Sequence, residues 1–253
     1  MIELWQLPLL FLTGLVAGFV DSIAGGGGLI ALPALLSCGL DPRHALGTNK
    51  FQASFGSGSA AWHYAHAGAV DLKDCRRSFA LSVLGAALGT LVVQQLDPTL
   101  LRRAIPVLLI VVAIYVLLRP ELGSEDRQPR MKRGSFDLLF VFGIAFYDGF
   151  FGPGAGTFWT MALVLVQGRN FVSATGTTKV LNAASNVASL AVFAVARQFV
   201  LPAVVVMAAG QLVGARVGAR LVVRRGARFV QPLFLGMACV VILRLLWVTY
   251  IQP

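Results

Sequence analysis

The sequence predicts an all-α polytopic membrane protein made of two inverted repeats, each with a re-entrant or broken helical hairpin plus three transmembrane helices. Three observations support this fold class. Apolar residues make up 57% of the 253 residues and charged residues only 13%, which leaves too little polar surface to coat a water-soluble globule. The apolar residues gather in long stretches, and the two halves of the chain match each other.

The apolar stretches have the lengths and patterns of membrane helices. Val107–Leu118 and Val200–Met207 are apolar on every face, unlike the alternating strands of a porin. No basic residue precedes the first stretch, so we expect it to stay in the mature protein. Seven of the stretches reach the about 17–25 residues that cross a bilayer. The stretches are residues 4–20, 28–38, 46–66, 78–95, 100–118, 136–150, 155–167, 173–195, 200–222 and 229–250.

An internal repeat divides the chain into two membrane units. Residues 18–28 (GFVDSIAGGGG) match 145–155 (AFYDGFFGPGA), and residues 45–50 (ALGTNK) match 174–179 (ATGTTK). A third match, of 85–89 with 214–218, follows in the same order. We therefore predict a first membrane repeat at 1–118, a cytoplasmic linker at 119–135 and a second membrane repeat at 136–253.

Positive charge favours inverted repeats over parallel ones. With three net crossings per half, most basic residues lie on the side of the linker, which the positive-inside rule assigns to the cytoplasm. Four crossings per half would place the basic cluster of 216–228 outside. The three-crossing arrangement puts both termini outside. The basic residues that it places beside the linker are Lys73, Arg76, Arg77, Arg169, Arg216, Arg220, Arg224, Arg225 and Arg228.

Glycine-rich breaks precede two stretches that are too short to span. Residues 28–38 and 155–167 cover roughly half a bilayer as helices, so their N-termini should lie at membrane depth. Helix N-termini present free N–H groups and partial positive charge to an anion. The alternative is that the glycines permit a tight turn or close helix packing. The predicted anion cradles are Gly25, Gly26, Gly27 and Gly28 in the first half and Gly152, Gly154 and Gly156 in the second.

Lys50 and Lys179 occupy matching positions inside apolar stretches. An ammonium group in hydrocarbon costs at least about 2.5 kcal/mol, so something must compensate it. In the functional interpretation, the lysines and their polar neighbours attract an anion. In the alternative, they snorkel to the interface or pair permanently with Asp21 and Asp148. The polar neighbours are Thr48, Asn49, Thr177, Thr178 and Asn182, and Asn186, Ser54 and Ser57 extend the same helical faces.

Asp21 and Asp148 each lie four residues before a glycine-rich break. Three roles fit this position. A buried carboxylate can carry a proton, serve as counter-ion to a lysine, or cap the backbone where the helix breaks.

Other chemistry finds little support in the residues. Cys38, Cys75 and Cys239 are far apart and lack metal-binding spacing, so we expect inert core residues, with no metal and no cofactor. Residues 62–66 (WHYAH) fit an interfacial anchor better than a metal site or proton relay. Basic residues in loops argue against a nucleic-acid partner. No catalytic triad, Walker loop, HExxH or dinucleotide motif predicts an enzyme.

At these same residues the chain resembles the sulfite exporter family TauE/SafE, particularly its YfcA-like members. The likeness covers nearly the whole length and rests on residues 18–28, on Gly47-Thr48-Asn49-Lys50 and on weaker echoes in the second half. The resemblance implies a bacterial inner-membrane permease for sulfite or small organosulfonates, driven by a secondary gradient. In the second half Thr178 stands where Asn49 does in the first, so a shared site would be asymmetric.

Together these features predict a multi-pass secondary transporter that moves a small anion by alternating access, with protons as a candidate coupling ion. An anion channel and a non-transporting membrane receptor or scaffold are the alternatives. The expected partners are the anion and the lipid bilayer, and the sequence makes no prediction of oligomeric state.

Overall fold

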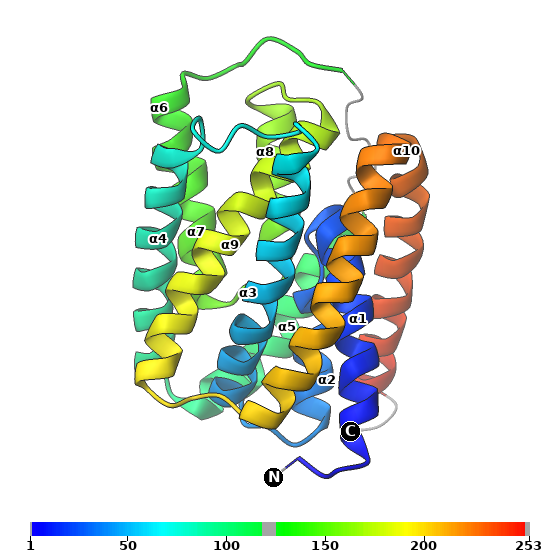
Figure 1. Ribbon diagram of the computed structural model, residues 1–253. Coiled ribbons are helices and arrows are strands. Elements are labelled where there is room, and N and C mark those ends of the chain that lie inside the picture. Colours follow the sequence, from blue (N-terminus) through cyan, green and yellow to red (C-terminus); the bar gives the residue numbers. More distant parts are fainter. Residues whose placement is uncertain (1, 118–124, 251–253) are drawn as a thin grey trace.

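A computed structural model describes residues 2–117 and 125–250, and all regular secondary structure within them is helical. The prediction of an all-α protein is therefore confirmed. Figure 1 shows the helices packed into one bundle. In chain order they are α1 (Gln6–Ala24), α2 (Gly28–Ser37), α3 (Pro42–His66), α4 (Arg76–Gln95), α5 (Pro98–Leu117), α6 (Arg133–Phe136), the π-helix η1 (Asp137–Val141), α7 (Phe142–Phe150), α8 (Ala155–Leu165), α9 (Phe171–Val195) and α10 (Leu201–Tyr250).

The bundle has the surface of a multi-pass membrane protein. Within the described residues, parts of four helices, α1, α4, α9 and α10, are long and apolar enough to cross a bilayer. Large apolar side chains point outward from them, as Leu9, Leu12 and Val16 do along one face of α1. Soluble proteins rarely expose so much continuous apolar surface, whereas lipid covers it at no cost.

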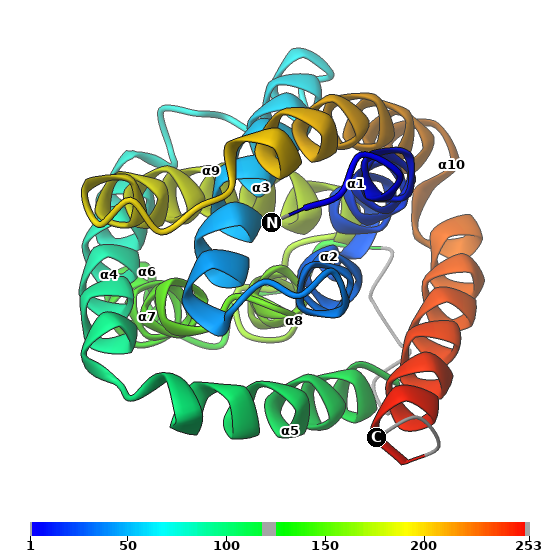
Figure 2. The same ribbon diagram turned by 90° about the horizontal axis from the view of Figure 1, so that it is seen from below.

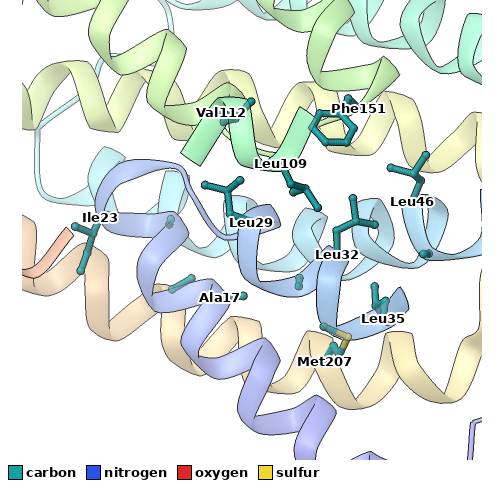
Figure 3. Packing of buried hydrophobic residues seen from close by; sticks show 14 of the residues in the cluster. Ala17, Ile23, Leu29, Leu32, Leu35, Leu46, Leu109, Val112, Phe151 and Met207 are labelled. Carbon is teal, nitrogen blue, oxygen red and sulfur yellow. The ribbon is translucent and has the colours of Figure 1, made fainter. Parts of the chain in front are cut away.

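The two short stretches are helices, as predicted, and protein surrounds them. Figure 3 shows Leu29 and Leu32 of α2 facing Leu109 and Val112 of α5, while Leu35 points toward Met207 of α10. Leu29, Leu32 and Leu35 are three residues apart, so their side chains turn gradually around the helix axis. α2 therefore packs against neighbours on more than one side. The breaks before α2 and α8 therefore lie inside the protein rather than against lipid.

α10 differs from the two separate stretches, 200–222 and 229–250, expected from the sequence. It is one continuous helix of 50 residues. In Figure 1 its last part, in red, runs back toward the end of the molecule where α10 begins. Residues 223–228 contain Gly226, whose backbone bends easily, and no proline, so helical residues continue on both sides of the reversal.

α3 and α9 pack against each other at the centre of the bundle (Figures 1 and 2). Both bury many polar side chains, including Lys50 on α3 and Lys179 on α9. Burial in a membrane protein requires each polar group to find a partner within the protein. The centre of the bundle is thus a polar core inside an apolar shell.

At two edges of the bundle, a helix of one half packs against a helix of the other half. α4 of the first half packs on α7 of the second, and α10 of the second half packs on α1 of the first. Glycines allow both approaches: a Cβ on Gly85 would lie 2.6 Å from the carbonyl oxygen of Phe142, and one on Gly218 would lie 2.6 Å from that of Phe19. Gly89 and Gly214 make equivalent contacts, so these small residues let the helices approach closely.

Candidate functional site

The two glycine-rich breaks meet in the interior. Gly25 ends α1 in the left-handed conformation, with φ of 81°, and packs directly on Gly156 near the start of α8. A Cβ on Gly25 would lie 2.5 Å from the backbone nitrogen of Thr157, so the contact requires glycine. Gly28 of α2 packs on Pro153 in the same way, and a Cβ on Gly28 would lie 3.1 Å from the Cα atom of Pro153. Close packing and a tight turn, the plainer of the two interpretations, are therefore features of these breaks.

Lys50 of α3 forms an ion pair with Asp148 of α7, across the two halves. The Lys50 Nζ to Asp148 Oδ1 distance is 2.7 Å, and the side chains are 2% and 5% exposed. Asn186 Oδ1 accepts a second hydrogen bond from Lys50 at 3.4 Å, and Ser185 donates to Asp148 Oδ2. Ser57 joins through a 3.2 Å hydrogen bond from Asn186 Nδ2. Both charges thus have several partners, which a buried ion pair needs to be stable.

Lys179 of α9 makes the corresponding pair with Asp21 of α1. The Lys179 Nζ to Asp21 Oδ2 distance is 3.0 Å, and Lys179 is completely buried while Asp21 is 18% exposed. Each lysine therefore pairs with the aspartate of the other half. The counter-ion role predicted for both aspartates describes this arrangement. It also fits the alternative of permanent lysine–aspartate pairing, so the pairs alone do not decide between the two interpretations.

The breaks lie next to the lysines. A Cβ on Gly152 would meet Lys50 Nζ at 3.1 Å, so the ammonium sits beside the break before α8. Asn182, one turn after Lys179, lies at Gly156. Gly27 packs on Asp21, and Gly26 and Gly27 supply the carbonyl groups that start α2. Gly154 faces Val112 of α5 and lies farther from the charges.

The remaining predicted residues bond to different partners. Thr178 accepts or donates a 3.0 Å hydrogen bond with Thr160 of α8, and Asn49 accepts one of 3.0 Å from Gln52. Thr48 accepts from the backbone of Val200, and Thr177 from Arg169. The last two contacts lie where α3 and α9 begin, so the structure gathers the lysines, aspartates and breaks but spreads the threonines outward.

Sequence reasoning missed three residues of this region. Ser185 donates a hydrogen bond to Asp148 and lies on the same face of α9 as Asn182 and Asn186. The helical spacing of these three residues could have identified Ser185 from the sequence. Arg169 was treated as an orientation charge although it bonds Thr177. Asp137 gave no signal, because a single acid at the start of an apolar stretch ordinarily faces solvent, whereas here it is 2% exposed.

Metal-binding clusters of three or more His, Cys, Asp or Glu do not occur among the described residues. Cys38 and Cys75 have free thiols rather than disulfides. The side chain of Cys239 is not among those that the structure describes. Trp62 is 66% exposed and its ring packs on that of His66 near the end of α3, a placement that suits an interfacial anchor.

Comparison with known proteins decides the family. The family described as "Sulfite exporter TauE/SafE" matches residues 10–245. The chain belongs to the TauE/SafE family. It is 42% identical to "Probable membrane transporter protein YfcA" of Escherichia coli K12, over 95% of this chain and 90% of that protein. It is also 42% identical to a "Probable membrane transporter protein" of Haemophilus influenzae, over 92% and 91% of the two chains.

A third TauE/SafE relative, "Probable membrane transporter protein ORF9" of a Sinorhizobium species, is 41% identical over 95% of this chain and 92% of its own. No solved structure matches the chain significantly. The names of the family and of these relatives indicate a membrane transporter rather than an enzyme.

Proposed function

We propose that this TauE/SafE protein is a secondary transporter that moves a small anion, sulfite or an organosulfonate, across the bacterial inner membrane by alternating access. One observation carries the proposal. Two buried lysines, each held by a carboxylate of the other half, lie beside two helix breaks that touch each other at the centre of the bundle.

The ion pairs suggest how an anion is recognised. A carboxylate and a sulfonate or sulfite present similar oxygen atoms to an ammonium group, so an anion can replace Asp148 on Lys50 or Asp21 on Lys179. The exchange leaves each lysine compensated, which limits the energy of desolvation. The helix N-termini beside the breaks add partial positive charge at the same place. Sulfite as substrate class comes from the family description alone.

Alternating access requires two arrangements of similar energy, and inverted repeats supply them. The exchanged contacts support this element of the proposal. Lys50 on Asp148 mirrors Lys179 on Asp21, and Gly85 on α7 mirrors Gly214 on α1. When one set of these equivalent contacts opens and the other closes, the site faces the opposite side of the membrane.

Charge gives the proposed orientation. Figure 1 places the start of α4, the described part of the linker, the connection from α8 to α9 and the reversal of α10 at one end of the molecule. Most of the basic side chains lie in these segments. By the positive-inside rule this end faces the cytoplasm. We call it the linker end below.

The test is anion uptake into liposomes that contain the purified protein. Sulfite, sulfoacetate, taurine and sulfate are compared, with and without a pH gradient. We expect at least one sulfur oxyanion to accumulate when the gradient is imposed. A flux that only follows the anion's own electrochemical gradient indicates a channel, and no flux for any of the four overturns the proposal.

Paired substitutions separate transport from structure. Lys50→Met with Asp148→Asn removes both charges at once and leaves neither unpaired, so the fold should survive. We expect uptake to fall by at least about 100-fold, the size of other losses of a charged substrate contact. Lys73→Met, at an exposed loop lysine, is the matched control and should transport normally. Normal uptake by the double variant would show that the pair has a structural role alone.

A further inference from the structure

A second polar site lies between the linker end and the buried lysines. Eleven residues from α4, α6, η1, α8, α9 and their connections line a small pocket there. Thr177 forms part of its wall, two residues before Lys179. The polar and ionisable lining residues are Cys75, Ser78, Arg133, Asp137, Gln167, Arg169 and Thr177.

Asp137 is the unusual member of this pocket. Its side chain is 2% exposed, and Ser78 donates a 2.8 Å hydrogen bond to Oδ1. Its second oxygen, Oδ2, is buried without a hydrogen-bond partner. The nearest recorded cation, Arg77 Nε, is 3.9 Å away on a side chain that is 68% exposed. A buried carboxylate oxygen that lacks a partner is unfavourable, and a proton would relieve it.

The other charged groups around Asp137 are committed elsewhere. Arg133 of α6 donates to the carbonyl oxygen of Asp74, and Arg169 donates to Thr177 at 2.7 Å. Burial raises the pKa of the Cys75 thiol, so that group stays neutral. α8 carries no ionisable side chain, and on α7 the acid is Asp148, eleven residues on and paired with Lys50.

The local backbone is also irregular. Asp137 is the first residue of η1, where the N–H of Phe142 bonds to its carbonyl oxygen in place of the usual helical partner. Such π-helical turns often occur at functional sites. The matching position in the first half is Leu10, a core residue, so the pocket has no polar counterpart there.

From this arrangement we propose that Asp137 binds the proton that accompanies the anion. The inference rests on the proposed anion transport and assigns its coupling site. Asp21 and Asp148, the sequence-based candidates, are already paired with lysines. A hydronium ion at the linker end transfers one proton to Oδ2: one of its O–H bonds breaks, an O–H bond forms on Asp137, and a water molecule is left.

Charge explains how the proton and the anion are linked. While Asp137 is ionised, its negative charge repels an anion that enters the pocket, which Arg133 and Arg169 also line. A proton on Asp137 removes that repulsion, and an anion bound in the pocket in turn favours the proton. The two ligands therefore bind cooperatively, and the coupling is reciprocal.

The test compares Asp137→Asn with the unchanged protein in the same liposomes. Asp74→Asn, which neutralises an exposed acid at the same end, is the matched control. The probe is sulfoacetate, whose charge is constant between about pH 6 and pH 8; if the uptake panel shows no sulfoacetate flux, sulfate, whose charge is also constant in that range, takes its place. Two quantities are measured: accumulation driven by a pH gradient, and exchange of labelled anion with no gradient.

We expect Asp137→Asn to exchange anion but to lose accumulation above the equilibrium level. Anion affinity should rise about 5–150-fold on acidification in the unchanged protein and stay constant in the variant. Accumulation by Asp137→Asn that equals that of the Asp74→Asn control overturns the proposal. Absence of both exchange and accumulation in the unchanged protein instead defeats the proposed function itself.

A second variant decides the matter if Asp137→Asn does not fold. Ser78→Ala keeps the carboxyl group but removes the donor that favours its ionised form, so proton binding becomes easier. We expect the midpoint of the pH dependence of uptake to move to higher pH. An unchanged midpoint would also overturn the proposal.

Discussion

The two buried ion pairs have the same residues at matching positions but unequal surroundings. Lys50 and Asp148 are almost fully buried and share hydrogen bonds with Asn186 and Ser185. Lys179 bonds to an Asp21 that is 18% exposed, and the structure records no further side-chain hydrogen bond for that carboxylate. A repeated motif thus fixes which charges meet, while neighbouring residues set how firmly they are held. The Lys179–Asp21 pair is the easier of the two to open.

The largest expected effect on the free energy of unfolding comes from removing the carboxylate charge of each lysine–aspartate pair while the lysine remains. Asp148→Asn leaves Lys50 charged in a dry site and should destabilise the protein by about 3–5 kcal/mol. Asp21→Asn should cost less, about 1–3 kcal/mol, because water reaches that carboxylate. Thermal unfolding in detergent, compared between the two variants, measures the difference. Equal losses would mean that the surroundings of the pairs do not matter.

The breaks should also differ in their tolerance of a side chain. Gly25→Ala combines a left-handed backbone with a clash against the backbone of the second break, and we expect a loss of about 3 kcal/mol. In Gly152→Ala the added methyl group would lie 3.1 Å from Lys50 Nζ and 3.3 Å from the carbonyl oxygen of Asp148, contacts looser than those at Gly25, so about 1–2 kcal/mol is expected, mainly from the left-handed backbone. Unfolding midpoints test this order. A Gly152→Ala loss as large as that of Gly25→Ala would contradict it.

Ser185 is one source of the asymmetry between the pairs, because Gly56 takes its place in the first half. Ser185→Ala removes the hydrogen bond to Asp148 and should lower stability by about 1–2 kcal/mol. Ser54→Ala is the matched control, since Ser54 bonds to the carbonyl oxygen of Lys50 in its own helix. Similar unfolding curves for the two variants would remove Ser185 from the explanation.

The smallest effect concerns the linker end. The backbone N–H and side-chain amide of Asn170 hold the pKa of Asp126 below its usual value. Since the folded pKa is lowered, this tether is fully present above about pH 4 and is lost as pH falls through the lowered value. The protection factor of the Asn170 amide, its intrinsic exchange rate divided by the observed rate, should therefore fall in acid.

Asp97 provides a control at the opposite end of the molecule. Its pKa is lowered by the N–H of Thr99, a bond that stays within its own segment. Asp97→Asn should leave the protection factor of Asn170 unchanged, whereas Asp126→Asn should make that protection low at every pH. A high protection factor that does not change with pH in the unchanged protein would contradict the tether.

The helices and the ingredients of the site could be predicted because both depend on local pattern. Apolar stretches gave the helices, glycines gave the breaks at 25–28 and 152–156, and the improbable burial of Lys50 and Lys179 indicated compensating partners. The continuous α10 could not be predicted in this way. Arg224, Arg225 and Gly226 indicate a break between two stretches. The chain does turn back within α10, but its residues remain helical through the turn.

The pairing of charges was beyond the sequence for a different reason. Lys50 lies 98 positions from Asp148, and Lys179 lies 158 from Asp21, so their meeting depends on how the halves pack. The motifs place a lysine and an aspartate in each half, and they do not say whether each lysine pairs with the aspartate of its own half or with that of the other half. The burial of Asp137 likewise depends on α4 and on the connection before α9, which no local pattern near residue 137 reveals.

The exchanged glycine contacts bear on how the protein is made. α1 is synthesised before the other described helices, but the surface that fits Leu15 and Phe19 belongs to α10, which is synthesised after all of them. Lipid must cover that face of α1 until α10 has been synthesised. In the same way, lipid must cover the face of α4 that packs on α7 until α7 has been synthesised. Neither half is a finished folding unit, and a nascent chain that stops after its first half has assembled no complete bundle.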